Sequence, residues 1–220
     1  MDPPRLVLAS ASPRRRRLIG WLGLPVSLTA VDTPEDITAP LPPAELARSL
    51  AAEKALAARA EGAPGTVLAL DTIVVLEREV LGKPRDRAHA REMLRRLSGG
   101  KHEVVTGVAV MPPEADAPHT FAVTTPVTMR ELSEDVVEAW LSGDEALGCA
   151  GAYNIERHLA SVADDECFNN VAGMPLCHLY RALAFGDSGA VPEGLVPPVA
   201  TCDEALGRRC RLGPVVCGTP

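Results

Sequence analysis

The longest apolar segment of the chain, residues 66–76 (TVLALDTIVVL), contains a single carboxylate, that of Asp71. A run of this length, rich in β-branched residues, predicts a buried strand. A carboxylate inside such a strand stays charged only if a cation, a metal ion or donated hydrogen bonds compensate its burial. Asp71 therefore marks either a functional site or a structural ion pair. We favour the functional site, because strand ends in α/β sheets usually carry such groups.

Strand and helix patterns alternate on both sides of this segment. Apolar, β-rich patterns predict strands at 5–9, 26–31, 66–76, 79–81, 102–111 and 120–129. Capped or amphipathic patterns predict helices at 13–22, 43–60, 86–97, 133–141 and 175–185. This alternation indicates an α/β fold with helices flanking a twisted sheet, and the adjacent strands at 102–129 indicate a mixed rather than a purely parallel sheet.

The 220 residues suit one domain with a short addition. We assign residues 1–186 to the domain. The last 34 residues, 187–220, change character, because they contain five Pro, five Gly and three of the six Cys. We expect this C-terminal extension to be loosely ordered, and we assign no chemistry to it.

The charge balance excludes several classes of partner. The formal net charge of −7 argues against a nucleic-acid partner, which would require a basic face. No apolar run reaches the roughly 18 residues that span a bilayer, so we expect no membrane partner. The N-terminus shows no basic-then-apolar leader, so we expect a cytoplasmic protein.

The cysteine and histidine spacing argues against a dedicated zinc site. The six cysteines contain no C-x-x-C pair, and the five histidines form no H-E-x-x-H motif. In a reducing compartment, these thiols are expected to be free.

The segment from Ser10 to Arg17 (SASPRRRR) combines a helix start with four arginines. Ser12 is a good N-cap, and Pro13 suits the first helical position. Four cations near the positive end of a helix dipole are unfavourable unless an anion binds there. The segment predicts an anion site, although a solvated basic helix face is the plain alternative.

Only three of the 22 basic residues are lysines: Lys54, Lys83 and Lys101. Lys54 shares a predicted helix face with two leucines, and Lys83 lies in a Gly-Lys-Pro sequence that cannot be helical. A compact ammonium group suits phosphate binding. The alternatives are a lysine that snorkels from a helix edge and a lysine in a surface turn.

Taken together, these cations and acids suit metal-assisted hydrolysis of a phosphoanhydride. No Ser or Cys–His nucleophile is evident, and the P-loop motif G-x-x-x-x-G-K-[ST] is absent. A nucleotide- or phosphosugar-binding domain without turnover remains an alternative. The carboxylate of Asp71 favours the enzyme, because a pure binding module has no reason to hold an acid in an apolar strand.

Six motifs then carry a resemblance. They are SASPRR, AAEKA, ALDTIVVLEREVLGKP, MLRRLSGGKHEVVTGVAV, AGAY and GMPL, in this order. Over about residues 5–185, the set resembles the Maf family of nucleoside triphosphate pyrophosphatases. The resemblance implies an inosine-triphosphatase-like α/β fold with an active-site cleft between two lobes. It also implies a divalent metal cofactor, Mg²⁺ or Mn²⁺, and hydrolysis of a nucleoside triphosphate to a monophosphate and pyrophosphate. The resemblance is compatible with a homodimer. The family pattern has no segment that corresponds to the extension.

The resemblance implies roles for the residues at matching positions. The phosphate-binding roles fall on Ser10, Arg14, Arg15, Lys54 and Lys83. The resemblance assigns metal binding and the activation of water to Glu35 and Asp71, with Asp71 as the general base. The family is also associated with arrest of septum formation, so a non-catalytic regulator is the alternative from another class.

Substrate choice depends on four positions. Members that act on dTTP and UTP read S-P-R-R, A-D-T and K-A-G-A-Y-G-I-Q-G, whereas those that act on 7-methyl-GTP read S-P-W-R-R, S-D-Q and C-A-G. Arg14 and Thr72 match the first group, whereas Cys149 and Glu156 lean toward the second. An acid in place of an amide alters the donors offered to a base, so Glu156 is expected to affect preference. We expect dTTP and UTP, because no Trp replaces Arg14; 7-methyl-GTP or another modified nucleotide is the alternative.

Overall fold

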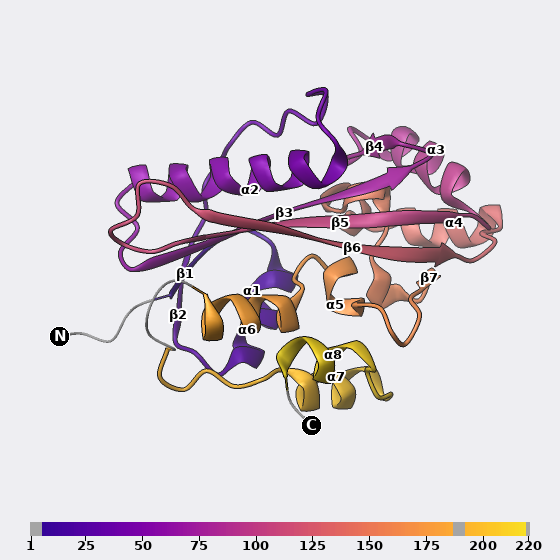
Figure 1. Cartoon of the computed structure of the whole chain (residues 1–220). Helices are drawn as coiled ribbons and strands as arrows, with labels where there is room; N and C mark the ends of the chain where they lie inside the picture. Colours follow the sequence, from indigo (N-terminus) through magenta and orange to yellow (C-terminus); the bar gives the residue numbers. More distant parts are fainter. Residues whose placement is uncertain (1–5, 187–191, 219–220) are drawn as a thin grey trace.

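The computed structural model of the chain describes residues 6–186 and 192–218, and a seven-stranded sheet forms its centre (Figure 1). The strand order is β2-β1-β3-β5-β6-β7, and β4 pairs with β3. The bounds are β1 (Leu6–Ala9), β2 (Val26–Thr29), β3 (Thr66–Leu76), β4 (Glu79–Leu81), β5 (Lys101–Met111), β6 (His119–Met129) and β7 (Ala160–Ser161). Strand β1 pairs in parallel with β2 and β3, whereas the other pairs are antiparallel. The predicted mixed sheet is confirmed.

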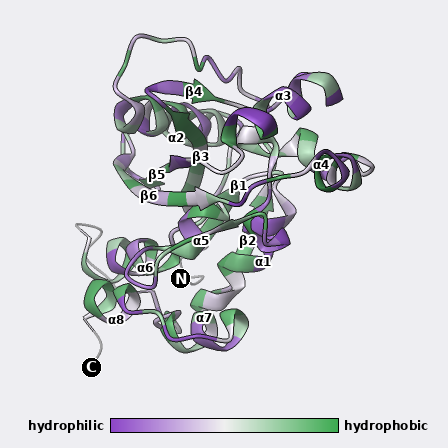
Figure 2. Cartoon of the chain, turned by 90° about the vertical axis from the view of Figure 1, so that its right-hand side faces the viewer, coloured by the Kyte–Doolittle hydropathy of each residue, from purple (hydrophilic) through white to green (hydrophobic). Residues whose placement is uncertain are grey.

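Helices cover both faces of this sheet. Their bounds are α1 (Pro13–Ile19), α2 (Pro43–Ala60), α3 (Arg87–Leu97), α4 (Glu134–Leu141), α5 (Phe168–Val171), α6 (Leu176–Phe185), α7 (Val199–Leu206) and α8 (Leu212–Cys217). Helix α2 lies on one face, and α1, α5 and α6 lie on the other (Figure 1). Figure 2 shows the same layers from the side. Among the described residues, no helix has both the length and the apolar character that crossing a bilayer requires.

The alternation of side chains along β3 places polar groups on both faces. Asp71 lies on the same face as Ala69 and Ile73, which pack under α2. Thr72 lies on the opposite face, with α1 and α5. Helix α2 approaches the sheet closely, because Gly107 of β5 has no side chain. A β-carbon there would lie 2.0 Å from the carbonyl oxygen of Ala47.

A gap in the sheet lies beside the centre of β3. Strand β1 pairs with β3 only as far as Ala69, and β4 begins to pair with it at Val74. Among the described strands, none pairs with residues 70–73 on that side, although β5 pairs with all four on the other side. The gap brings Asp71 and Thr72 to a point where the strand order changes, which is where ligands usually bind in α/β sheets.

The described part of the extension contains regular structure, which the expectation of a loosely ordered tail did not include. Where the structure describes it, residues 192–218, it contains α7 and α8, and Cys202 and Cys217 are 5 % and 3 % exposed. Helix α8 packs on α6 and on α7. In this part, Pro and Gly separate two short helices whose cysteines are buried like small apolar residues. Residues 187–191 and 219–220 lie outside the described residues, so the expectation for the extension as a whole stays a prediction. The boundary at residue 186 stays a prediction.

Candidate active site

A cavity of about 700 Å³ opens beside the gap in the sheet. It is lined by the end of β1, the start of α1, α2, the centre of β3 and the loop after β4. Eight of the nine residues that the sequence predicts for the site line it: Ser10, Arg14, Arg15, Glu35, Lys54, Asp71, Thr72 and Lys83. The opposite wall comes from residues 144–153, so the cavity lies between two groups of elements, as the expected cleft requires.

Two carboxylates share one ammonium group at the centre of the cavity. Lys54 Nζ donates to Glu35 Oε1 at 2.8 Å and forms a second ion pair with Asp71 Oδ1. The side chains of Lys54 and Asp71 are 12 % and 6 % exposed, so this pair is well shielded from water. Sequence reasoning left open whether Asp71 is compensated by a cation or by a metal ion; in this structure the cation is Lys54.

The second lysine of the site pairs with Glu35 alone. Lys83 Nζ lies 2.9 Å and 3.0 Å from the two oxygens of that carboxylate. Burial alone would raise the pKa of Glu35, but the Lys54 and Lys83 ammonium groups outweigh it and lower the pKa to about 2. Glu35 is therefore a charged anchor for both lysines at neutral pH.

Arg15 is tied into the protein by every nitrogen of its guanidinium group. Nε donates to the carbonyl oxygen of Gly173 at 2.9 Å, Nη1 to that of Leu70 at 2.7 Å, and Nη2 to Thr72 Oγ1 at 2.9 Å. The bond to Leu70 satisfies a backbone acceptor that the sheet gap exposes. Burial lowers the pKa of Arg15, and the charge of Asp71 opposes this shift. Arg15 lines the cavity, and these bonds also hold α1 against β3, while its phosphate-binding role stays a prediction.

Thr72 extends this chain of hydrogen bonds beneath the site. Its Oγ1 lies 2.9 Å from Thr106 Oγ1, which in turn donates to the carbonyl oxygen of Asn170 at 3.1 Å. Thr72 Oγ1 also accepts the hydrogen bond from Arg15. The hydroxyl group of Thr72 therefore joins the cavity wall to α5.

Arg14 is free of such backbone bonds and reaches the opposite wall. Its Nη1 donates to Cys149 Sγ at 3.2 Å, and its Nε is buried without a hydrogen-bond partner among the described residues. Burial raises the pKa of the Cys149 thiol, and Arg14 partly offsets this shift. Cys149 donates in turn to the carbonyl oxygen of Glu145 at 3.2 Å. Among the described residues, the Cys149 thiol is therefore the one hydrogen-bond partner of the Arg14 guanidinium group.

Sequence reasoning missed two groups on that wall. The carboxylate of Glu145 accepts bonds from Asn154 Nδ2 at 2.5 Å and from Arg157 Nη2 at 2.8 Å. Burial alone would raise the pKa of Glu145, but these bonds lower it. The hydroxyl group of Tyr153 lies 2.8 Å from His102 Nε2. No sequence signal distinguishes Glu145 from the other 28 acids, because its partners lie in later turns that only the fold brings together.

Glu156 is the one predicted site residue that does not line the cavity. Its carboxylate forms an ion pair with Arg17 on the outer side of α1, and the two side chains are 29 % and 54 % exposed. The local structure is a turn from Ile155 to Arg157 (η4), capped by Asn154 Oδ1, which accepts a hydrogen bond from the backbone N–H of Glu156. The position of Glu156 therefore does not support the expected contact between its side chain and the nucleotide base.

The donor set around Lys54 fits a hard divalent cation. Carboxylate oxygens are the protein ligands that Mg²⁺ prefers, and it is commonly held by one or two carboxylates together with substrate phosphates. Glu35 and Asp71 supply two carboxylates to one cavity. Residues 6–186 and 192–218 contain no group of three or more His, Cys, Asp or Glu side chains placed to hold a metal ion. A cation here would therefore take its remaining ligands from phosphate and water.

The chain is similar to known proteins over most of its length. A family model described as Maf-like protein matches residues 5–185. A protein of Bacillus velezensis named dTTP/UTP pyrophosphatase is 41 % identical over 181 residues, which cover 81 % of this chain and 95 % of the relative. A protein of Geobacter sulfurreducens with the same name is 40 % identical over 188 residues, covering 83 % and 97 %. The solved structure of a HAM1 protein from Coxiella burnetii has a TM-score of 0.42 at 17 % identity, covering 57 % of this chain and 73 % of that one.

Proposed function

The chain belongs to the Maf-like protein family, and on that premise we propose that it is a nucleoside triphosphate pyrophosphatase that acts on dTTP and UTP. The observation that carries the proposal is the pairing of Glu35 and Asp71 with Lys54 and Lys83 inside one cavity. Cations that hold phosphates, next to carboxylates that can serve a metal ion and a water molecule, are the equipment of phosphoanhydride hydrolysis. The names of the two relatives support the choice of pyrimidine nucleotides.

The lysines retain hydrogen-bonding capacity for a triphosphate. An ammonium group has three N–H donors. Lys54 directs two toward Glu35 and Asp71, and Lys83 directs two toward the oxygens of Glu35. Each lysine therefore has one donor left for a phosphate oxygen. Arg14, whose protein partner is a thiol, adds a guanidinium group from the other side.

The reaction assigned to this site is attack of water on the α-phosphorus. The new bond joins the water oxygen to the α-phosphorus, the bond to the oxygen that bridges the α- and β-phosphates breaks, and pyrophosphate leaves with its electron pair. The proton of the water passes to the carboxylate of Asp71, which lies at the gap in the sheet. Lys54 holds this carboxylate in place through their ion pair.

A divalent cation is part of the proposal, held by Glu35 and Asp71. When bound, it would neutralise phosphate charge and lower the pKa of the attacking water. The protein's own contribution is to orient the two carboxylates through Lys54 and Lys83. A cytoplasmic location also belongs to the proposal, because the free state of all six cysteines suits a reducing compartment.

A product analysis tests the proposal. The protein is incubated with dTTP, UTP, 7-methyl-GTP and the common nucleoside triphosphates, with Mg²⁺ or Mn²⁺, in water labelled with heavy oxygen. We expect monophosphate and pyrophosphate from dTTP and UTP, with the label in the monophosphate. Diphosphate and free phosphate would contradict the proposed bond cleavage, and label in pyrophosphate would contradict attack at the α-phosphorus. Faster turnover of 7-methyl-GTP would favour the alternative substrate, for which Cys149 in the cavity wall is the supporting observation.

A further inference from the structure

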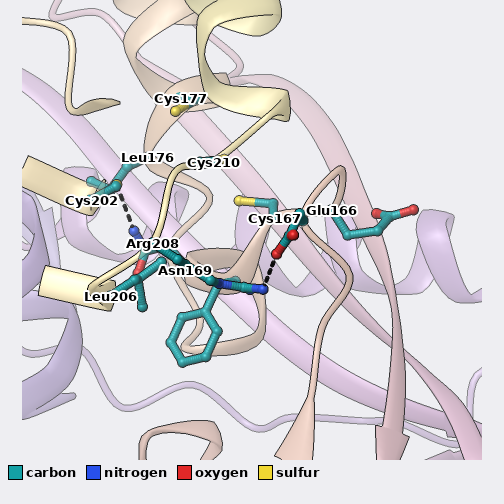
Figure 3. A pocket seen from close by; sticks show the side chains of 11 residues that line it. Glu166, Cys167, Asn169, Leu176, Cys177, Cys202, Leu206, Arg208 and Cys210 are labelled. Atoms are coloured by element: carbon teal, nitrogen blue, oxygen red, sulfur yellow. Dashed lines mark hydrogen bonds and ion pairs between the residues drawn. The ribbon is translucent and has the colours of Figure 1, made fainter. Parts of the chain in front are cut away.

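Two cavities of very different size bear on where a nucleobase can bind. The smaller has a volume of about 20 Å³ and lies between the extension, α5 and α6 (Figure 3). Four cysteines line it, Cys167, Cys177, Cys202 and Cys210, and it has room for a single water-sized sphere. The cavity at the sheet gap, with about 700 Å³, has the size of a nucleotide site. The base of the substrate therefore belongs in the larger cavity.

The two walls of this larger cavity present different groups. Lys54 and Lys83 lie on one wall, and the proposed function places the phosphates beside them. The base is at the other end of a nucleotide, so it lies toward the opposite wall. There the cavity is lined by Cys149, Ala150 and Tyr153, whose side chains offer apolar surface to the face of a base. A polar group on this wall is therefore placed to read the edge of the base.

Two adjacent carboxylates line this wall, and one of them is directed away from it. Asp144 is 86 % exposed and pairs with Arg87 of α3 at 3.1 Å. Glu145 instead accepts hydrogen bonds from Asn154 Nδ2 at 2.5 Å and from Arg157 at 3.1 Å and 2.8 Å. Neither Asn154 nor Arg157 lines the cavity, so these donors hold the carboxylate from behind the wall.

The carboxylate of Glu145 keeps one acceptor position for a ligand. An ionised carboxylate accepts about four hydrogen bonds. Asn154 Nδ2 occupies one position on Oε1, and Arg157 Nε and Nη2 occupy two on Oε2. The remaining position, on Oε1, can take a single N–H donor.

The surroundings of Glu145 keep it negatively charged. Burial opposes its ionisation, but the bonds from Asn154 and Arg157 and the nearby charge of Arg14 lower its pKa. Among the described residues, Arg14 forms no hydrogen bond with this carboxylate and instead donates to Cys149 Sγ. Glu145 is therefore a charged acceptor at neutral pH, and Arg14 does not occupy its remaining position.

We propose that Glu145 is a specificity-determining residue, which accepts the ring N–H at N3 of uracil or thymine. This inference rests on the proposed function and names the group that reads the base. A donor is required opposite Glu145, because its carboxylate is an acceptor only. Uracil and thymine carry one such ring N–H, and the methyl group of thymine lies on C5, away from N3. The contact therefore serves dTTP and UTP alike.

Other bases fit this single acceptor less well. Cytosine has an unprotonated N3, whose lone pair would face the negative carboxylate. Guanine presents two adjacent donors, N1–H and the N2 amino group, whereas Glu145 has one position left. A polar site that leaves such groups unpaired discriminates strongly between ligands. The same count argues against 7-methyl-GTP, the alternative substrate.

Binding of nucleotide analogues to the full-length protein, with Mg²⁺ present, tests the proposal. In these analogues a methylene group replaces the oxygen between the α- and β-phosphates, so the proposed reaction cannot occur. The uridine analogue is compared with its N3-methyl and C5-methyl versions and with the cytidine analogue by titration calorimetry. We expect the N3-methyl group, and the change to cytosine, to weaken binding roughly tenfold or more, because a hydrogen bond to a charged group is lost. Methylation at C5 should leave binding unchanged.

Glu145→Gln assigns the contact to this residue. When the amide oxygen faces Arg157, the amide N–H takes the position that faces the base, so a donor replaces the acceptor. We expect this variant to bind the uridine analogue more weakly and to lose the preference over the cytidine analogue. The matched control is Glu138→Gln, because Glu138 pairs with Arg91 outside the cavity. It should keep the parental preference. If Glu145→Gln does not fold, Glu145→Asp, which withdraws the carboxylate by one methylene group, should lose the preference in its place.

Three outcomes overturn the proposal. They are equal parental affinity for the uridine analogue and its N3-methyl version, a parental preference retained in the Glu145 variant, and failure of the parental protein to bind the uridine analogue. Hydrolysis of UTP is measured separately. Pyrophosphate release without an effect of the Glu145 substitution would contradict this inference alone. A base preference that depends on Glu145, without pyrophosphate release, would contradict the proposed function alone.

Discussion

Lys54 and Asp71 form a shielded ion pair that joins α2 to the centre of β3. The pair lies at the gap between β1 and β4, where β3 pairs with β5 on one side and with no described strand on the other. Neither charge would be stable there alone, because burying an isolated charge costs several kcal/mol. The same pair also places a carboxylate and an ammonium group next to each other at the cavity. A structural ion pair and a functional site are therefore not alternatives at Asp71, since one arrangement serves both.

Asp71→Asn is expected to lower kcat by roughly 10² or more while the fold is retained. The amide cannot accept the proton of water and is a poor ligand for a hard cation. Lys54 keeps its bond to Glu35, so no charge is left without a partner. Pyrophosphate release and thermal unfolding are measured on the same preparation. Asp116→Asn, at an exposed position in the β5–β6 connection, is the control and should match the parental protein. Early unfolding with parental turnover would show that Asp71 is purely structural.

Lys54→Met is expected to raise KM for UTP and to lower the free energy of unfolding by about 3 kcal/mol at neutral pH. The substitution leaves the carboxylate of Asp71, whose side chain is 6 % exposed, without its counter-ion. It also removes one donor for phosphate. Urea unfolding and initial-rate kinetics measure the two effects. The matched control is Lys101→Met, which removes an exposed lysine at the start of β5. Equal effects of the two variants would contradict the proposed role of Lys54.

Glu156→Gln is expected to leave the ratio of kcat/KM for UTP and for 7-methyl-GTP unchanged. Glu156 pairs with Arg17 outside the cavity, so the amide has no base to contact. Cys149→Lys, by contrast, is expected to change this ratio, because Cys149 lines the cavity and contacts Arg14. Both variants are compared with the parental protein on the same substrate panel. A shift caused by Glu156→Gln alone would mean that the 154–157 turn rearranges when nucleotide binds.

The stability of the protein is expected to fall as the pH decreases from 6.5 to about 4, owing to His102. Burial lowers the pKa of this histidine from 6.5 to about 4, so the unfolded chain binds a proton in this range that the folded protein does not. The stabilisation is complete above pH 6.5, and the loss reaches on the order of 3 kcal/mol at the acidic end. Urea unfolding across this range measures it. His102→Gln should flatten the profile relative to the parental protein, whereas the exposed His119→Gln should not. Identical profiles for all three proteins would contradict the assignment.

The amino-acid sequence by itself determined the elements and the main chemical groups. The pattern predicted a helix over 43–60 and a strand over 66–76, and both have these bounds in the structure. Helix caps, apolar periodicity and turn residues act over a few positions, so they can be recognised without knowing the fold. Asp71 stood out for the same reason, since a single acid in an apolar strand is a local anomaly. Short elements such as α5 and η4 were not predicted from the sequence, because their few residues carry little periodic signal.

Only the tertiary structure decided what each charged or sulfur-bearing side chain contacts. Arg14 and Arg15 are adjacent and chemically identical, yet Arg15 is bonded to β3 and the segment after α5, whereas Arg14 reaches Cys149. The partner of Glu156 is Arg17, which is 139 residues away along the chain. The cysteines before α5, in α6 and in the extension meet at one small cavity for the same reason. Such contacts depend on strand order and on the packing of helices on the two faces of the sheet. Those relations join residues that are remote in sequence, so no local pattern records them.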